Sequence, residues 1–486
     1  MDNIIRSSNP IWHKVDRGIK MTRSSIMLLG IALWFILGCI ISFLARKRTG
    51  PGIAEYFIAN RTIGGFVAAM TYSATTYSAF MMVGLVGMTY SFGVSTMGFE
   101  LSYLMGTILL LVLFAPYFWS ISRKYDCITP SELLSKAYHS PVLGGITTIF
   151  SMLMLIPYMS VQFTGIGYLL ESLTGIPYQL GVFFTLIIIL VFTLWAGMRS
   201  VAWTDTLQSL IMFISSIVLL YYVMNHFFGG FNQFFQVIQN DHNDLLAANK
   251  MPFQRFLGLT IPWLFFALTN PQVAQRMFIS RDKKSLRIMI TGFAVFGLIY
   301  TLIVVHLGLA ARHIFPDIVN TDMITPMILE KIPVALALVV FLGIVAASVS
   351  TVNSIILTLS SMSTVDVYGK LFKVEEGKRL LFGKIMVPLI ALSAFFFSLG
   401  QFGVIVELSV MSSAGLLALA PSYFGIFWKK GNSIASISSI VVGGLTTIVM
   451  YFTGYFPLGI WPGMWCLIIS STIFFLVSII RYSKKA

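Results

Sequence analysis

Residues 64–90 read GGFVAAMTYSATTYSAFMMVGLVGMTY, an apolar stretch long enough to cross a bilayer that carries hydroxyl groups in its middle. Irregular backbone persists at membrane depth only where protein covers it or where it lines a cavity. We therefore expect an unwound hinge over residues 74–78, whose freed carbonyl oxygens would suit a hard cation. The alternative is a continuous helix whose hydroxyls donate to its own carbonyls. The hydroxyl-bearing residues are Thr71, Tyr72, Ser73, Thr75, Thr76, Tyr77 and Ser78.

The rest of the chain is equally apolar. Of its 486 residues 57% are hydrophobic and 10% are charged, and the mean hydropathy is +0.87. A water-soluble protein of this composition would have an insoluble surface. Thirteen apolar runs leave no stretch for a separate soluble domain, so we expect an all-α polytopic membrane protein with about 13 transmembrane helices. The runs cover residues 25–46, 64–90, 96–121, 143–171, 176–197, 202–227, 256–279, 286–311, 332–364, 380–400, 404–428, 433–453 and 459–480.

Basic residues predict how the chain is oriented. The alternate loops that begin at Arg46 and end at Lys485 hold 23 of the 32 Lys and Arg residues, and the opposite loops with the N-terminal tail hold nine. Because cytoplasmic loops are enriched in positive charge, we expect the N-terminus outside and the C-terminus inside. The basic tail would then be translocated, unless Met21 is the natural start, which would remove four of its five charges. The net charge of +14 therefore needs no nucleic-acid partner.

A second apolar run, residues 256–279, is also interrupted. It carries Pro262 and then Thr269, Asn270, Pro271 and Gln272. Proline removes a backbone donor and disfavours helix at the residue before it. This break lies five runs after the first, the spacing of an inverted repeat of five plus five helices, and paired interruptions point to a midplane binding site.

Residues 341–368, FLGIVAASVSTVNSIILTLSSMSTVDVY, carry a stripe of small and hydroxyl side chains. Residues three and four apart share a helix face, so Ala347, Ser350, Thr351 and Ser354 lie together. This stripe would suit an ion site against a broken neighbour. It would equally suit close packing between membrane helices.

Acidic side chains inside apolar runs are functional candidates, because burying a charge without a partner is costly. Asp205 is the strongest, although it would also serve as an interfacial helix cap. Glu100 and Glu407 are similar cases, and Glu171 and Asp366 read as interfacial; all four fit a structural role better. No Lys or Arg falls in the predicted membrane centre, so an anionic solute would need helix dipoles, hydroxyls or a bound cation.

Six strings, in this order and spacing, resemble the sodium:solute symporter family, which includes sodium-coupled proline, pantothenate, sialic acid, monocarboxylate and sugar transporters. Each string is weak alone, but together they are specific and span nearly the whole chain. They are AMTYSATTYSAFMMVGLVG (69–87), CITPSELL (127–134), GMRSVAWTDTLQ (197–208), NPQVAQR (270–276), ASVSTVNS (347–354) and APSYFGIFWKK (420–430).

The resemblance implies a leucine-transporter-like 5+5 inverted repeat with one extra N-terminal and two extra C-terminal helices. The implied parts are an extracellular tail (1–24), an extra helix (25–46), the first repeat (64–227), the second repeat (256–428), two C-terminal helices (433–480) and a cytoplasmic tail (481–486).

The resemblance also implies a sodium site between the first broken span and the helix over 341–368. Its ligands would be the carbonyls of Ala74, Tyr77 and Ala347 and the hydroxyls of Ser350 and Thr351. Some members of the family hold a second sodium ion, for which the matching residues here are Ser350, Asp205, Asn353 and Ser354. Asn353 departs from the serine of the pattern, and without a second ion Asp205 would instead stage sodium release.

Solute in this family lies across the two broken spans. The hydroxyl cluster and its small neighbours favour a monocarboxylate or an amino acid over pantothenate, sialic acid or a sugar. The matching residues are Thr75, Thr76, Ser78, Met81, Glu100, Gln162, Phe163, Trp263 and Asn270.

These features together predict sodium-coupled uptake by alternating access in the plasma (inner) membrane, in which the ion joins the two helices in the outward-facing state. Sodium is the coupling ion, and we expect no other cofactor and no obligatory protein partner beyond membrane lipid. One rival couples the same fold to protons through Asp205 or Glu407. Another is a membrane sensor or enzyme, although the sequence shows no metal cluster, nucleophile elbow or phosphate loop.

Overall fold

The structure, a computed structural model, describes residues 22–372, 374–402 and 405–483. The predicted tails therefore lie largely outside the described residues. Within these ranges every regular element is helical, as the sequence predicts. The first elements are α1 (Arg23–Arg46), α2 (Ile53–Ile58), η1 (Ala59–Arg61), α3 (Gly65–Thr76), η2 (Phe80–Leu85), α4 (Val86–Phe92), α5 (Val94–Lys124), α6 (Pro130–Ala137), α7 (Pro141–Thr174), α8 (Tyr178–Phe228), α9 (Phe231–Asp241) and η3 (Asn243–Leu246).

The second part of the chain is built in the same way. It comprises α10 (Phe253–Leu264), α11 (Phe266–Thr269), α12 (Pro271–Ile279), α13 (Lys283–Ile314), η4 (Thr321–Met323), α14 (Ile324–Lys331), α15 (Val334–Met362), η5 (Ser363–Tyr368), α16 (Gly369–Leu371), α17 (Glu376–Leu399), α18 (Ile405–Leu416), η6 (Leu417–Leu419), α19 (Ala420–Gly425), α20 (Ser433–Thr453), η7 (Pro457–Gly459) and α21 (Pro462–Ser483).

Ten helices in the described residues are long and apolar enough to cross a membrane. The predicted run over 176–197 corresponds to the shorter apolar helix Tyr178–Leu194, and the runs over 64–90 and 256–279 are divided into several pieces. The multi-span, all-helical class is therefore confirmed. The count of 13 and the inverted repeat stay predictions.

Residues 178–228 differ from the expectation of two spans joined by a loop. They form one element, α8, with a sharp kink at Gly197. Gly197 has φ +62° and ψ −153°, a combination that only glycine adopts readily. A Cβ there would lie 2.3 Å from the backbone oxygen of Tyr56, so the helix can turn at this point only because the side chain is absent.

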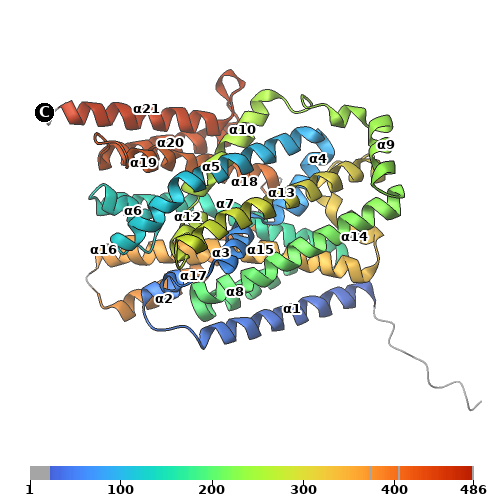
Figure 1. The fold of residues 1–486 in the computed structure, drawn as a ribbon, viewed down its shortest axis with the longest axis horizontal. Helices are drawn as coiled ribbons and strands as arrows, with labels where there is room; N and C mark the ends of the chain where they lie inside the picture. The colour runs from blue at the N-terminus through green and yellow to red at the C-terminus, as the bar shows by residue number, and fades with distance from the viewer. Residues whose placement is uncertain (1–21, 373, 403–404, 484–486) are drawn as a thin grey trace, which may run out of the picture.

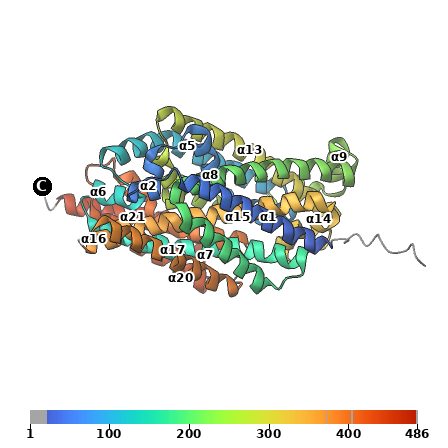
Figure 2. The same ribbon diagram turned by 90° about the horizontal axis from the view of Figure 1, so that it is seen from below.

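The helices pack around a central group formed by α3, α8, α13 and α15. α15 lies against α8, and α3 contacts both α13 and α8. Figure 1 shows α1 along one edge of the bundle and α20 and α21 along the opposite edge. In Figure 2, α7 and α17 run beside α15, which they also contact. The segments singled out in the sequence are therefore interior elements.

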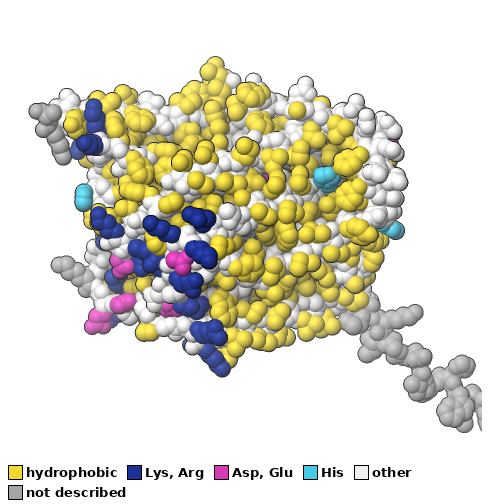
Figure 3. All heavy atoms as spheres, in the orientation of Figure 1, with side chains coloured by type: hydrophobic (Ala, Val, Ile, Leu, Met, Phe, Trp, Pro, Cys, Tyr) yellow, Lys and Arg dark blue, Asp and Glu magenta, His cyan; other side chains and the backbone are white. Residues whose placement is uncertain are grey.

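Lys and Arg side chains gather at one end of the molecule, the end that holds α2, α6 and α16 (Figure 3). Broad hydrophobic surface covers the adjoining part of the face in this view. The basic loops that alternate along the sequence therefore meet at one end.

Candidate functional site

The first broken span is interrupted as the sequence predicts, but slightly later. α3 continues to Thr76, and the hydroxyls of Thr75 and Thr76 donate to the carbonyls of Thr71 and Tyr72 in their own helix. Tyr77 is extended, with φ −94° and ψ 113°, and helical backbone resumes as the π-helix η2. The hinge and the back-bonding hydroxyls, which were alternatives from sequence, both occur.

This segment lies inside the protein. Every residue from 71 to 78 is buried. Buried polar groups are expected to have hydrogen-bond partners, so neighbouring helices must supply partners for the backbone groups that the break leaves free. Gln162 of α7 provides one contact, because its Oε1 accepts the backbone N–H of Ala79 at 3.2 Å.

α15 provides the central contact. Ser350 Oγ donates to the carbonyl oxygen of Ala74 at 3.0 Å, and Thr351 Oγ1 donates to the same oxygen at 3.2 Å. Ser350 Oγ also lies 3.0 Å from the carbonyl oxygen of Ala347. The structure thus brings four of the five predicted sodium ligands together, and Tyr77 lies at the break, three residues after Ala74.

This cluster has the chemistry of an alkali-cation site. Its members are neutral oxygens, two from hydroxyls and two from carbonyls, and all of their residues are buried. Carbonyls near an unwound helix, joined by hydroxyls, are the donors that transporters offer to sodium. Small residues allow this close approach, because Ala74 and Ala347 place no bulky side chain between α3 and α15.

A second buried cluster lies about one helical turn further along α15. Thr71 Oγ1 donates to Asp205 Oδ2 at 2.6 Å, and the Nη2 of Arg276 lies 3.8 Å from that oxygen. The same Nη2 donates to Ser354 Oγ at 2.5 Å, and Ser354 shares a hydrogen bond of 2.9 Å with Thr75. Asp205 is therefore a paired interior residue of α8, not a cap in water.

Arg276, near the end of the run over 256–279, was not singled out as a buried charge in the sequence analysis, which predicted no Lys or Arg in the membrane centre. Its side chain is 0% exposed. α12 is covered on all sides, and each of its nine residues is buried. The string NPQVAQR contained a signal for this position. Proline favours the first turn of a helix, so a helix that restarts at Pro271 includes Arg276 and carries it into the buried segment.

The second broken span also matches the prediction. α11 ends at Thr269, Asn270 is extended with φ −92° and ψ 107°, and Pro271 opens α12. Both amide atoms of Asn270 lack a hydrogen-bond partner among the described residues, although the residue is 1% exposed. Such orphaned groups are what a solute would satisfy.

Aromatic rings surround Trp263, which precedes this break. Its ring centroid lies 5.0 Å from that of Phe80, 5.6 Å from that of Tyr103 and 4.8 Å from that of Phe266. The indole N–H of Trp263 has no partner within the described part of the chain. Tyr103 was not singled out in the sequence, although it lies three residues after Glu100 on the same face of α5.

Glu100 of α5 is buried in the protein. It is 1% exposed, and neither carboxyl oxygen has a partner among the residues that the structure describes. Met81 and Phe163 are buried as well, and Ser78 Oγ accepts the N–H of Phe80 at 3.2 Å. Glu100 is therefore the strongest polar candidate in the predicted solute set.

Two other acidic residues have defined surroundings. Asp366 is covered by protein, and its Oδ2 accepts the hydroxyls of Thr129 at 2.5 Å and Ser131 at 2.6 Å. Glu407 has a side chain that is 53% exposed, and its carboxyl lies 3.8 Å from Arg255, so it belongs to the surface of the bundle and not to its interior. An exposed carboxyl is poorly placed to carry protons through the bundle.

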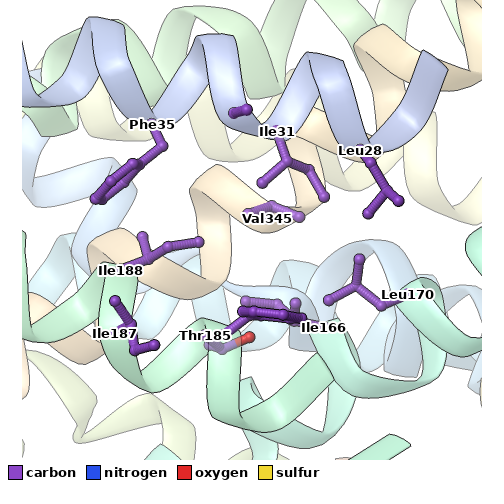
Figure 4. Close-up of a pocket in the computed structure, with 11 residues that line it drawn as sticks. Leu28, Ile31, Phe35, Ile166, Leu170, Thr185, Ile187, Ile188 and Val345 are labelled. Carbon is purple, nitrogen blue, oxygen red and sulfur yellow. The ribbon is translucent and has the colours of Figure 1, made fainter. Parts of the chain in front are cut away.

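A pocket of about 300 Å³ between α1, α7, α8 and α15 lies apart from these clusters (Figure 4). Among its lining side chains only Thr185 carries a polar group; Leu28, Ile31 and Val345 are typical of the rest. It contains none of the predicted site residues, and its apolar walls do not suit a polar solute.

Known proteins resemble this chain along most of its length. A model of the "Sodium:solute symporter family" matches residues 56–443. The chain is 28% identical to a sodium/pantothenate symporter of Escherichia coli (strain K12), over 89% of this chain and 92% of that protein. It is 26% identical to an osmoregulated proline transporter of Bacillus subtilis (strain 168), over 88% of this chain and 89% of that protein.

Solved structures show the same fold. A sodium-coupled sialic acid symporter in a substrate-bound outward-open state superposes with a TM-score of 0.77 at 17% identity, covering 94% of this chain and 96% of that one. MhsT in complex with L-phenylalanine gives a TM-score of 0.50 at 14% identity, covering 86% of this chain and 97% of that one. These similarities establish the architecture.

The family model and the curated relatives thus define the class of protein, a secondary transporter of the membrane and not an enzyme. The chain belongs to the sodium:solute symporter family, and its function is accordingly sodium-coupled symport of a small molecule.

Proposed function

We propose that this symporter imports a small carboxylate or amino acid by alternating access, with sodium held between the carbonyls of Ala74, Tyr77 and Ala347 and the hydroxyls of Ser350 and Thr351. The observation that carries the proposal is the meeting of Ser350 and Thr351 at one carbonyl oxygen of a broken helix. A cation there would hold α3 to α15 in the outward-facing state and complete the solute pocket.

The solute would lie between the two breaks. In this proposal the wall of the solute site next to the first break is formed by Thr75, Thr76, Ser78, Met81, Gln162 and Phe163. Trp263, Asn270 and Glu100 supply unpartnered polar groups on the other sides. Of the two favoured classes an amino acid suits Glu100 better, because an ammonium group would compensate the carboxyl that the protein leaves unpaired.

We also place the protein in the plasma (inner) membrane with its N-terminus outside. The gathering of Lys and Arg side chains at one end in Figure 3 supports this orientation, because positive loops stay in the cytoplasm. Inward movement of one positive charge through about 100 mV contributes about 2.3 kcal/mol, and a tenfold sodium gradient adds about 1.4 kcal/mol. Together they support several hundredfold accumulation of a neutral solute.

Two steps test the proposal. A thermal-shift screen of small acids, amino acids, vitamins and sugars in sodium and in choline buffer first identifies a solute. Uptake of that solute into proteoliposomes is then measured under a sodium gradient or a proton gradient alone. We expect accumulation with sodium only; accumulation driven by protons without sodium would support the proton-coupled rival instead.

The ligand assignment has its own variants. Ser350→Ala with Thr351→Ala should raise the sodium concentration for half-maximal uptake by about tenfold or more, since each lost oxygen ligand contributes on the order of 1 kcal/mol. Ser348→Ala is the matched control, because this buried hydroxyl on α15 has no partner among the described residues. An unchanged sodium requirement in the double variant would remove this site.

A further inference from the structure

Arg276 sits among the residues that the family pattern assigns to a second sodium ion. Its Nη2 donates to Ser354 Oγ at 2.5 Å and lies 3.8 Å from Asp205 Oδ2. Its Nη1 lies 3.0 Å from the sulfur of Met198. Both charged side chains are 0% exposed, so the guanidinium is the permanent counter-charge of the carboxylate.

The other side chains of that set are engaged by the chain itself. Thr193 Oγ1 donates to Asn353 Oδ1 at 2.8 Å, which uses the amide oxygen that would replace the serine of the pattern. Thr71 donates to Asp205 Oδ2 at 2.6 Å. Asp205 Oδ1 has no hydrogen-bond partner within the described residues, but one carboxylate oxygen does not replace the several water molecules that a bound sodium ion would lose.

The charge balance points the same way. One buried carboxylate and one buried guanidinium already sum to zero at this position. A sodium ion against Asp205 would bring a second positive charge next to the guanidinium in a region that water does not screen. The side chains present therefore do not fit a second ion while Arg276 holds this position.

We propose that Arg276 is a resident cation that takes the place of a second sodium ion, so that this symporter binds one sodium ion per cycle. The inference rests on the proposed sodium site at Ser350 and Thr351. The inference also gives Arg276 a positioning role. Its guanidinium, on the helix that follows the second break, donates to Ser354, one turn beyond Ser350 on α15. Thr75, the neighbour of Ala74 on α3, contacts the same Ser354 hydroxyl, so Arg276 helps to hold α3 and α15 together.

The test counts sodium ions on the full-length protein in detergent by equilibrium binding of ²²Na⁺, which needs no knowledge of the solute. At a sodium concentration that just saturates the natural chain, we expect one equivalent for the natural chain and a much lower occupancy for Ser350→Ala with Thr351→Ala. Two equivalents in the natural chain would overturn the inference while leaving the first site intact. No saturable binding at all would instead refute the proposed sodium site.

Variants of Arg276 identify its role. Arg276→Gln should bind a second equivalent, because Asp205 loses its counter-charge, whereas Arg276→Lys should stay at one. Asp205→Asn with Arg276→Gln should also stay at one, since both charges are gone. Arg255→Gln, which neutralises a partly exposed arginine elsewhere, is the matched control.

A monodisperse Arg276→Gln protein that still binds one equivalent would overturn the role assigned to the guanidinium. If that variant does not fold, the count on the natural chain and on the uncharged double variant decides the question. In that case one equivalent in both supports the inference, and two in either contradicts it.

Discussion

Ser350 Oγ donates to the carbonyl oxygen of Ala74 at 3.0 Å, across 276 positions of the chain. A helix interior would normally use that carbonyl for its own ladder. It is available to α15 because α3 ends at Thr76 and Tyr77 is extended. The contact therefore depends on the break, and it joins the two elements between which the symporter would hold sodium.

Glu100→Gln should weaken solute binding without changing the sodium requirement. The variant keeps the size of a side chain that is 1% exposed but removes its charge. If the solute donates to this carboxyl, the loss of a charged hydrogen bond costs about 1.5–3 kcal/mol, or roughly 10- to 150-fold in affinity. Thermal-shift titration with the identified solute, at fixed sodium, measures the change. A variant that binds the solute normally would exclude Glu100 from the solute site.

Glu407→Gln should retain sodium-driven uptake and change the free energy of unfolding by less than about 1 kcal/mol. The carboxyl is 53% exposed and lies 3.8 Å from Arg255, a distance typical of a loose surface pair. Proteoliposome uptake and thermal unfolding measure the two quantities. Loss of transport with normal folding would revive Glu407 as a proton carrier.

Gly197→Ala should destabilise the protein by about 1–3 kcal/mol or more, because it forces a Cβ into a backbone conformation that is nearly exclusive to glycine. The added carbon would also lie 2.3 Å from the backbone oxygen of Tyr56, which cannot move independently. Gly64→Ala is the control, since a Cβ there meets no atom within 4 Å. Thermal unfolding in detergent compares them, and equal stability of both variants would show that the kink relaxes.

Removing the two hydroxyls at Asp366 should be costly. Thr129→Val with Ser131→Ala leaves the buried carboxyl without donors that lie 2.5 and 2.6 Å away, at a cost of about 1–3 kcal/mol or more. Asp366→Asn in the same background should recover part of the loss, since it removes the unsatisfied charge. The order of the three unfolding temperatures checks this, and no recovery would mean that the loss comes from packing or from the helix cap by which Thr129 Oγ1 accepts the N–H of Glu132 at 2.9 Å.

Labelling should reveal the orientation. Val319 is 98% exposed in the connection after α13, and Lys429 is exposed near the basic end. In intact cells a membrane-impermeant maleimide should label Val319→Cys and not Lys429→Cys, in a background without the native cysteines. The opposite pattern would invert the predicted topology.

The sequence was sufficient for the class of fold and for the position of both breaks. Hydrophobic runs indicate membrane spans, because the apolar interior of the bilayer requires apolar side chains. Pro271 and the closely spaced hydroxyl groups indicate interrupted helices, because they alter the hydrogen bonding of the local backbone. It could not distinguish a hinge from back-bonded hydroxyls at residues 71–78. Both occur, because α3 keeps its helical bonds up to Thr76 and only then opens.

The sequence could not predict whether a given polar side chain is buried or which groups surround it. Arg276 lies near the end of an apolar run and before a basic loop, so composition does not show that its side chain is buried, and the same holds for the carboxyls of Asp366 and Glu100. Burial depends on which helices cover a given face. It is decided by contacts between residues far apart in the chain, such as Arg276 with Asp205 and Ser354.

The amino-acid sequence by itself determined that this chain spans a membrane many times, where two of its helices break and which oxygens stand near the breaks, because each of these follows from local composition and backbone chemistry. Only the tertiary structure decided which charges are paired inside the bundle and which oxygens meet at one point. Electrostatic balance and coordination are properties of distances in space, and those distances are set by the packing of the whole bundle.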